Sequence, residues 1–240
     1  MVRHLSTGAA SKLGQDPQRA LSGRNASTAR RAGLDVTHHP ADDGHDVHIN
    51  TSVCTRKDDA EPNGAAAFAF NETGAGNLAI AAAKGERLLV AAIPAGTCIV
   101  RTAWPCRAAG SNSTATMQGI AASHDTVSVV TGPPTWTGDL AGQIVELSNV
   151  DAPASLQHAT NSGEASWFDF TRESFTVAEF QPRWVATTTS AKYVSPAPRP
   201  GYCVLCHDAW ARLGISPMRD RCAVLSPAQS FGALTMLPAA

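Results

Sequence analysis

The sequence predicts an α/β fold with a parallel sheet at its N-terminal end. Short apolar or β-branched segments alternate with longer segments of helical spacing along most of the 240 residues. Such an alternation is typical of parallel sheets covered by helices. A glycine-containing turn over residues 7–14 follows the first apolar segment and leads into a helical pattern. Hydrophobic residues make up 43% of the chain and charged residues 16%, which indicates an ordinary globular core.

The expected elements follow in order along the chain. Strands are expected over residues 2–5, 46–50, 97–103, 125–130 and 156–159. Helices are expected over residues 77–93, 139–147, 166–175 and 208–213. Ser166 suits an N-cap because its hydroxyl can accept a hydrogen bond from an early backbone N–H, and Gly214 suits the end of the last helix. His48 weakens the apolar character of the second strand.

Charge and hydropathy exclude several classes of partner. The formal net charge of -1 gives no field that attracts nucleic acid or an anionic membrane, and no basic stripe is interleaved with aromatic residues. The longest apolar segments, such as residues 88–94, are far shorter than the roughly 20 residues of a membrane-spanning helix. Residues 1–13 lack the apolar core of a secretory signal. We therefore expect a cytoplasmic protein whose six cysteines are reduced thiols.

Segments in one shared order along nearly the whole chain match a known family. They are Thr7-Gly8-Ala9 with Leu13-Gly14, residues 33–37, 44–50 and 67–79, Arg101-Thr102-Ala103-Trp104, Gly132-Pro133-Pro134-Thr135, Asp139-Leu140-Ala141, Gly163-Glu164-Ala165-Ser166-Trp167-Phe168 and Pro196-Ala197-Pro198-Arg199-Pro200. Together they resemble the dTDP-4-dehydrorhamnose reductase family, a branch of the extended short-chain dehydrogenases. The shared order matters more than any single segment, because each one alone is weak evidence.

The resemblance implies a fold, a reaction and a set of ligands. The fold is a Rossmann-like parallel sheet, here incomplete, with a smaller C-terminal α/β substrate-binding part. Residues 1–104 are the implied NADP-binding domain, shortened near residues 83–87, and residues 105–240 the implied dTDP-sugar-binding domain. Family members use a nicotinamide hydride to reduce the 4-keto group of dTDP-6-deoxy-L-lyxo-4-hexulose to dTDP-L-rhamnose. The implied ligands are NADPH or NADH, a dTDP-linked deoxy sugar and Mg²⁺ as a further candidate; a homodimer is the implied assembly.

The cofactor site implied by the resemblance is the glycine turn. A pyrophosphate needs close approach to backbone N–H groups, and glycines at a strand-to-helix turn allow that approach. The family pattern brings to the cofactor Gly8, Ser11, Lys12, Leu13 and Gly14, together with Asp35 and Val36 after the second strand. Ser11 stands at the family's middle glycine, where its side chain would crowd the pyrophosphate.

On the substrate side the resemblance implies three residues, each with a plainer explanation. Trp104 would stack on or border the sugar nucleotide, although a core tryptophan at a strand end fits the pattern equally well. The guanidinium of Arg199 suits a diphosphate, although a loop arginine that caps carbonyls is an equal alternative. Asp58 matches a family position near the sugar, but most exposed loop aspartates have no such role.

The acid–base pair of the family is absent. A keto oxygen gains charge during reduction and needs a proton donor, which in short-chain dehydrogenases is a tyrosine with a lysine four residues later. The two tyrosines, Tyr193 and Tyr202, are followed at that spacing by Ala197 and Cys206. No catalytic residue is therefore intact. Binding of a nucleotide sugar or of another subunit, without turnover, is the alternative function.

A deletion of some tens of residues between Ala83 and Arg101 explains this absence. In the preferred alignment, residues 84–92 are the tail of the catalytic helix and residues 77–93 form one fused helix. Lys84 is then a displaced remnant of the catalytic lysine, or a solvated surface lysine. In the other alignment, residues 87–90 are the strand that precedes the deletion. Loss of a central strand would leave buried backbone N–H and C=O groups of its neighbours without hydrogen-bond partners, at a cost of about 1–3 kcal/mol each. The neighbouring strands must therefore pair with each other, or the sheet loses the strands beyond the deletion.

Two clusters compete with the reductase interpretation. Cys203-Val-Leu-Cys206-His207 matches the C-x-x-C-H haem signature, but haem attachment requires export. A zinc site of Cys203, Cys206, His207 and Cys222 has suitable ligand types at irregular spacing. The dense group His38, His39, Asp42, Asp43, His45, Asp46 and His48 would suit a divalent ion, but a solvated loop explains it better. We therefore predict no metal site.

Overall fold

The computed structural model describes residues 4–8, 13–22, 46–52, 57–76, 87–89, 98–106, 127–129, 135–150, 152–177, 179, 181–187 and 204–224. The chain divides into two units. The first contains Met1–Arg101, Ala141–His158 and His207–Ser216; the second contains Thr102–Leu140, Ala159–Cys206 and Pro217–Ala240. Each unit is therefore built from segments that are distant in the sequence.

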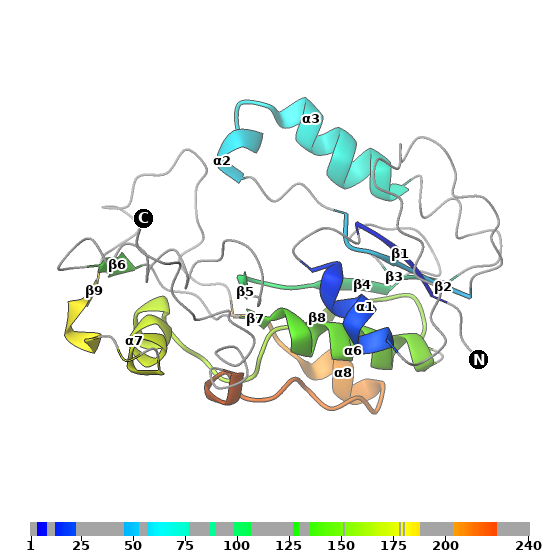
Figure 1. The fold of residues 1–240 in the computed structure, drawn as a ribbon. Coiled ribbons are helices and arrows are strands. Elements are labelled where there is room, and N and C mark those ends of the chain that lie inside the picture. Colours follow the sequence, from blue (N-terminus) through cyan, green and yellow to red (C-terminus); the bar gives the residue numbers. More distant parts are fainter. Residues whose placement is uncertain are drawn as a thin grey trace. The chain divides into compact units, whose positions relative to one another are not determined.

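A five-stranded parallel sheet forms the centre of the first unit (Figure 1). Its strands are β1 (His4–Thr7), β2 (Val47–Asn50), β3 (Arg87–Leu89), β4 (Cys98–Arg101) and β8 (Ser155–His158). The order across the sheet is β1-β2-β3-β4-β8, and every neighbouring pair is parallel. The predicted parallel sheet is thus confirmed. His48, the residue expected to weaken β2, is fully buried within it.

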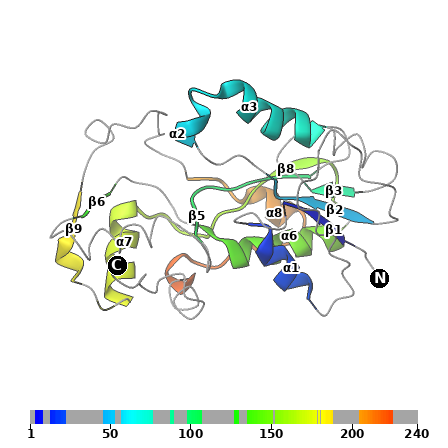
Figure 2. The same ribbon diagram turned by 45° about the horizontal axis from the view of Figure 1, so that its top comes forward.

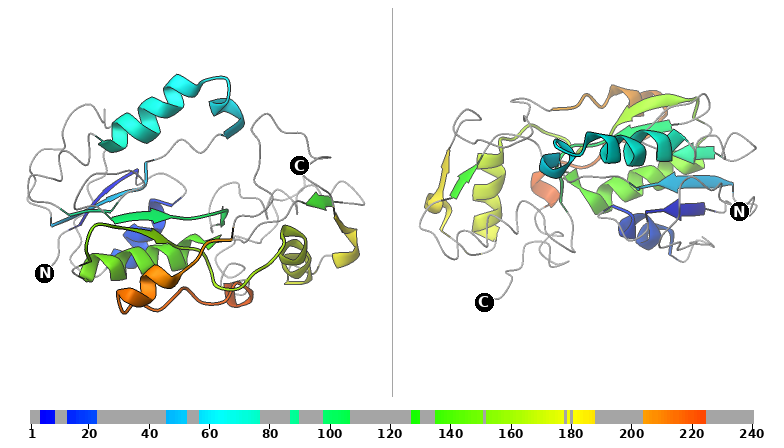
Figure 3. Two further views of the ribbon diagram at one scale, coloured as in Figure 1. Left: turned by 180° about the vertical axis from the view of Figure 1, so that it is seen from behind. Right: turned by 90° about the horizontal axis from the view of Figure 1, so that it is seen from above.

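Helices lie on both sides of this sheet. On one face lie α1 (Gln15–Leu21), α6 (Thr137–Asn149) from Ala141 onward, and α8 (Asp208–Arg212); on the other lie α2 (Lys57–Ala60), α3 (Gly64–Phe68) and the π-helical η1 (Ala69–Thr73) (Figures 1, 2 and 3). Buried residues of α6 recur at helical spacing, as in Ala141, Ile144, Val145 and Ser148. The Ser148 hydroxyl lies 3.0 Å from His4 Nε2, which ties α6 to β1. The layering confirms an α/β fold.

Strand β3 shows that the preferred alignment of residues 84–92 is wrong. Arg87–Leu89 is paired in parallel with β2, at Val47↔Arg87, His48↔Leu88 and Ile49↔Leu89, so it is not the tail of a helix. The fused helix over residues 77–93 is therefore wrong as well, and the alternative, a strand at this point, is confirmed. Its pairing with β4 is a single register pair, Leu89↔Cys98. This one short strand thus fills the position between β2 and β4 and keeps the sheet continuous.

The second unit contains two small parallel sheets and one longer helix. Strand β5 (Pro105–Cys106) pairs with β7 (Thr135–Trp136), and β6 (Val127–Val129) pairs with β9 (Val185–Thr187). Helix α7 (Trp167–Val177) packs against β9, β6 and the 3-10 helix η2 (Pro182–Trp184), burying Phe170 and Phe175. Ser166 caps α7 as predicted, because its Oγ accepts a hydrogen bond from the Asp169 N–H at 3.0 Å. Among the residues that the structure describes, no helix is long and apolar enough to cross a bilayer.

Candidate functional site

The turn after β1 requires glycine at its first position. Gly8 has a φ of +68, in the left-handed region that other residues rarely adopt. A Cβ atom at Gly8 would lie 2.5 Å from the backbone nitrogen of Ser52, in the segment that follows β2. That segment is fixed to the turn, since the Thr51 N–H and hydroxyl both donate to the Thr7 carbonyl, at 3.1 and 2.8 Å. The carboxyl ends of β1 and β2 are therefore in direct contact.

Gly14 allows α1 to begin against the same turn. It is buried at the N-cap of α1, and a Cβ there would lie 2.1 Å from the Gly8 carbonyl oxygen. The first and last glycines of a dinucleotide-binding turn have these two roles, the tight turn and the close packing of helix on strand. Leu13 precedes Gly14 in the described part of the turn. Ser11, Lys12, Asp35 and Val36 lie outside the described residues.

Trp104, in the second unit, has an unusual backbone conformation. Its φ is +48, which is an outlier for a bulky side chain and marks local strain. Thr135 holds this segment from β7, since its N–H donates to the Trp104 carbonyl at 3.1 Å and its hydroxyl to the Ala103 carbonyl at 2.6 Å. The Trp104 side chain is half-buried. Strain that the surroundings hold in place is typical of ligand-binding positions.

Asn161 joins three segments of the second unit through its buried amide. Its Oδ1 accepts the Trp136 N–H at 2.7 Å, and its Nδ2 donates to Asp139 Oδ2 at 2.8 Å and to the Arg219 carbonyl at 3.1 Å. The Arg219 guanidinium donates to the same Asp139 oxygen at 2.9 Å. Each polar group around Asn161 thus depends on it for one partner. This network fixes the start of α6 next to the loop that follows β8.

We expect Asn161→Ala to lower the free energy of unfolding by about 2–4 kcal/mol, because it removes partners from buried polar groups. The measurement is chemical denaturation followed by tryptophan fluorescence. Asn149→Ala is the matched control, since Asn149 is exposed and donates only to the Val145 carbonyl of its own helix at 2.9 Å. The control should stay within about 0.5 kcal/mol of the wild type. Equal losses in both variants would contradict the role given to Asn161.

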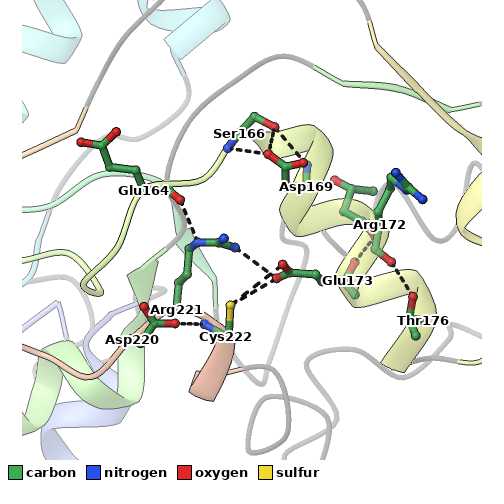
Figure 4. Close-up of polar contacts among 11 residues, drawn as sticks. Glu164, Ser166, Asp169, Arg172, Glu173, Thr176, Asp220, Arg221 and Cys222 are labelled. Carbon is green, nitrogen blue, oxygen red and sulfur yellow. Dashed lines mark hydrogen bonds and ion pairs between the residues drawn. The ribbon is translucent and has the colours of Figure 1, made fainter.

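Arg221 holds the loop before α7, which contains Gly163 and Glu164 of the family resemblance (Figure 4). Its Nε donates to the Glu164 carbonyl at 3.1 Å, and its Nη1 pairs with Glu173 Oε2 of α7 at 3.1 Å. The Cys222 thiol also donates to Glu173 Oε2, at 3.7 Å. Gly163 is required in the same loop, because its φ is +85 and a Cβ would lie 2.7 Å from Asp220 Oδ2. The loop before α7 is therefore held by the segment around Arg221.

Burial is the largest cause of the pKa shifts of three titratable side chains, Cys106, His207 and Cys222. Burial raises the pKa of the Cys106 thiol to about 12, so this thiol stays protonated at neutral pH. Burial and the nearby His158 lower the pKa of His207, although Asp208 opposes them. Burial raises the pKa of Cys222.

Within the described ranges, no group of three His, Cys, Asp or Glu side chains could hold a metal ion. Cys206 and Cys222 are free thiols, and Cys203 lies outside those ranges.

The remaining predicted residues are not brought together by the described structure. Asp58 lies in α2, but its side chain is outside the described part. Lys84, Arg199 and both tyrosines also lie outside it. Sequence reasoning missed the roles of Thr135, Asn161 and Arg221. Thr135 lies in the Gly132-Pro133-Pro134-Thr135 segment of the family resemblance, but a sequence pattern does not show which carbonyl a hydroxyl will reach.

Comparisons with known proteins agree on one family. Residues 83–227 match the family described as RmlD substrate binding domain. A dTDP-4-dehydrorhamnose reductase from Streptomyces griseus is 32% identical over 292 positions, covering 97% of this chain and 94% of that protein. A relative from Streptomyces antibioticus, a probable dTDP-4,6-dihydroxy-2-methyloxan-3-one 4-ketoreductase, is 40% identical over 139 residues, which are 57% of this chain and 47% of that relative.

Solved structures give the same result. A dTDP-4-dehydrorhamnose reductase from Clostridium acetobutylicum superposes with a TM-score of 0.81 at 26% identity, covering 95% of this chain and 99% of that chain. A dTDP-4-dehydrorhamnose reductase from Bacillus anthracis, solved in complex with NADP, has a TM-score of 0.84 at 23% identity, covering 95% and 98%. The second likeness shows the fold alone.

The alignment lengths bear on the predicted deletion. The alignment with the Streptomyces griseus protein runs over 292 positions, whereas this chain has 240 residues, so at least 52 positions have no residue here. Both chains are nevertheless covered almost from end to end. The missing positions are therefore internal; a single deletion between Ala83 and Arg101 stays a prediction.

Proposed function

Because the chain belongs to the dTDP-4-dehydrorhamnose reductase family, we propose that it binds NADPH and a dTDP-linked 6-deoxy-4-keto sugar and reduces that sugar only slowly. The glycine turn would hold the cofactor, and the second unit, with Trp104, would hold the sugar nucleotide. Slow turnover is proposed because no tyrosine with a lysine four residues later exists in the 240 residues. The cytoplasmic location, the homodimer and Mg²⁺ stay predictions.

The geometry of Gly8 and Gly14 is the observation that carries the proposal. Both positions exclude a side chain, and both lie at the carboxyl end of β1 in a parallel sheet, where dinucleotides bind in such folds. The residues present thus fit a pyrophosphate at two of the three family positions. Ser11, at the middle position of the pattern, departs from it and would weaken cofactor binding. NADPH is proposed rather than NADH, and the Bacillus anthracis protein of the same fold was solved in complex with NADP.

For the substrate, the support comes from the second unit. The match to a substrate-binding family covers residues 83–227, which include Trp104 and the segments that hold it. The strained backbone of Trp104 supports a ligand-binding role over that of an ordinary core tryptophan, because a core position needs no left-handed conformation. Arg199 and Asp58 are proposed as further contacts on the resemblance alone.

A non-catalytic role is the second candidate. The missing tyrosine and lysine favour it, because the binding surfaces of a protein can persist without the groups that do its chemistry. In this case the protein would bind a nucleotide sugar or another subunit and leave the keto group unchanged. Binding measurements alone do not separate the two candidates, whereas turnover does.

Calorimetry with NADPH and with dTDP tests both binding proposals. We expect heat of binding with each ligand, and an increase of about tenfold in NADPH affinity for Ser11→Gly, equivalent to roughly 1.4 kcal/mol. The gain is expected because the change removes the side chain that crowds the pyrophosphate. Ser22→Gly is the matched control, since Ser22 is the exposed C-cap of α1 and should leave NADPH affinity unchanged. Absence of heat with both ligands would rule out the reductase proposal and nucleotide-sugar binding without turnover.

A further inference from the structure

Thr135 contacts two successive carbonyls of the strained segment. Its N–H donates to the Trp104 carbonyl at 3.1 Å, and its hydroxyl donates to the Ala103 carbonyl at 2.6 Å. The Thr135 residue is fully buried, so water does not compete for either hydrogen bond. The Thr135 hydroxyl thus fixes the peptide group before Trp104, and the Thr135 backbone N–H fixes the peptide group after it. The β-branched side chain is itself rigid, so the hydroxyl is held in place.

These two contacts determine the direction of the Trp104 side chain. A backbone with φ of +48 sends the Cα–Cβ bond in a different direction from an ordinary extended or helical backbone. Such a conformation persists for a bulky residue only where the surroundings hold it. The pairing of β5 with β7 holds the Trp104 carbonyl through the Thr135 N–H, and the Thr135 hydroxyl adds a side-chain contact to the carbonyl before Trp104.

We propose that Thr135 is a positioning residue for the dTDP-sugar: it holds Trp104 in its left-handed conformation and thereby aims the indole at the nucleotide. The inference rests on the proposed function, since it requires Trp104 to contact the ligand. Thr135 itself is buried behind the segment and acts through Trp104 rather than by touching the ligand. Its hydroxyl is the group on which the proposal depends.

Thr137, the first residue of α6 directly after β7, offers a matched control. It is also fully buried, and its hydroxyl donates to the Cys106 carbonyl at 3.2 Å, two residues beyond Trp104. Thr137→Val therefore removes an equivalent hydrogen bond that does not involve the strained residue. A merely structural contribution of threonine hydroxyls would appear equally in both valine variants.

The experiment is calorimetry with dTDP on the full chain and its variants, with NADPH as the reference ligand. Thr135→Val should weaken dTDP binding about tenfold, as should Trp104→Ala, because each loses the aimed indole. Thr135→Ser keeps both hydrogen bonds and should bind as the wild type does, and Thr137→Val should too. Adding Thr135→Val to Trp104→Ala should produce no further loss, and NADPH affinity should stay constant throughout.

Three outcomes would overturn the inference. Wild-type affinity for dTDP in Thr135→Val would show that the hydroxyl is unnecessary, and independent losses in the double variant would show that it does not act through Trp104. A tenfold loss in Thr135→Ser, which is informative even where the valine variant fails to fold, would show the same. If the wild type binds no dTDP, the proposed function fails and this inference with it; if it binds and the variants disagree, only the inference fails.

Discussion

The wild-type protein is expected to consume NADPH with a dTDP-linked 4-keto-6-deoxy sugar at least about 100-fold more slowly than an intact member of the family. A positioned general acid contributes about 10²–10⁴-fold to a rate, and this chain has no tyrosine with a lysine at the family's spacing. The keto oxygen would have to take its proton from water or from a poorly placed group. The measurement is the loss of NADPH absorbance under saturating cofactor and sugar.

Two controls show whether a phenol nevertheless supplies the proton. Tyr193→Phe and Tyr202→Phe remove the two tyrosines of the chain one at a time, and neither should change the residual rate. An intact family member whose tyrosine of the Tyr-x-x-x-Lys pair is changed to phenylalanine should fall into the same range as this protein. A rate within tenfold of an intact reductase, or a loss of rate in either phenylalanine variant, would contradict the absence of a working acid.

Much of the fold could be predicted because its signals are local. Helix α7 begins at a serine cap that the sequence shows directly, and the Ser166 hydroxyl accepts the Asp169 N–H as expected. The strand at residues 46–50 was predicted from a short apolar run and forms β2, although His48 interrupts the pattern. Parallel pairing of β2 and its neighbours buries such a polar residue, because the surrounding strands determine burial more strongly than one side chain does.

Strand β3 could not be predicted from its own residues. The stretch around Leu88 and Leu89 also fits helical spacing, and an apolar run of this length is ambiguous between helix and strand. Pairing with β2 decides in favour of a strand, because an empty position there would leave backbone groups of β2 and β4 without partners. The contacts of Thr135 and Asn161 escaped prediction for a related reason: their partners are distant in the sequence.

Two glycine-to-alanine substitutions, one in the glycine turn and one in α6, should change the free energy of unfolding in opposite directions. Gly14→Ala should lower the free energy of unfolding by about 2–4 kcal/mol, because its Cβ would lie 2.1 Å from the Gly8 carbonyl oxygen and 2.7 Å from Thr51 Oγ1. The nearer atom belongs to the backbone, so relief requires α1 to move away from β1. NADPH binding should be lost as well, since the turn would open. Chemical denaturation and calorimetry measure the two effects.

Gly142→Ala is the matched control, because the same methyl group enters a helix with open space around it. Nothing lies within 4 Å of a Cβ at Gly142, in the interior of α6. Alanine there should raise the free energy of unfolding by about 0.5–1 kcal/mol, since it restricts the unfolded chain at no steric cost. NADPH affinity should not change. If both alanines shifted stability in the same direction, the contact of α1 with the turn would not be as tight as the structure indicates, and the cofactor proposal would lose the observation on which it depends.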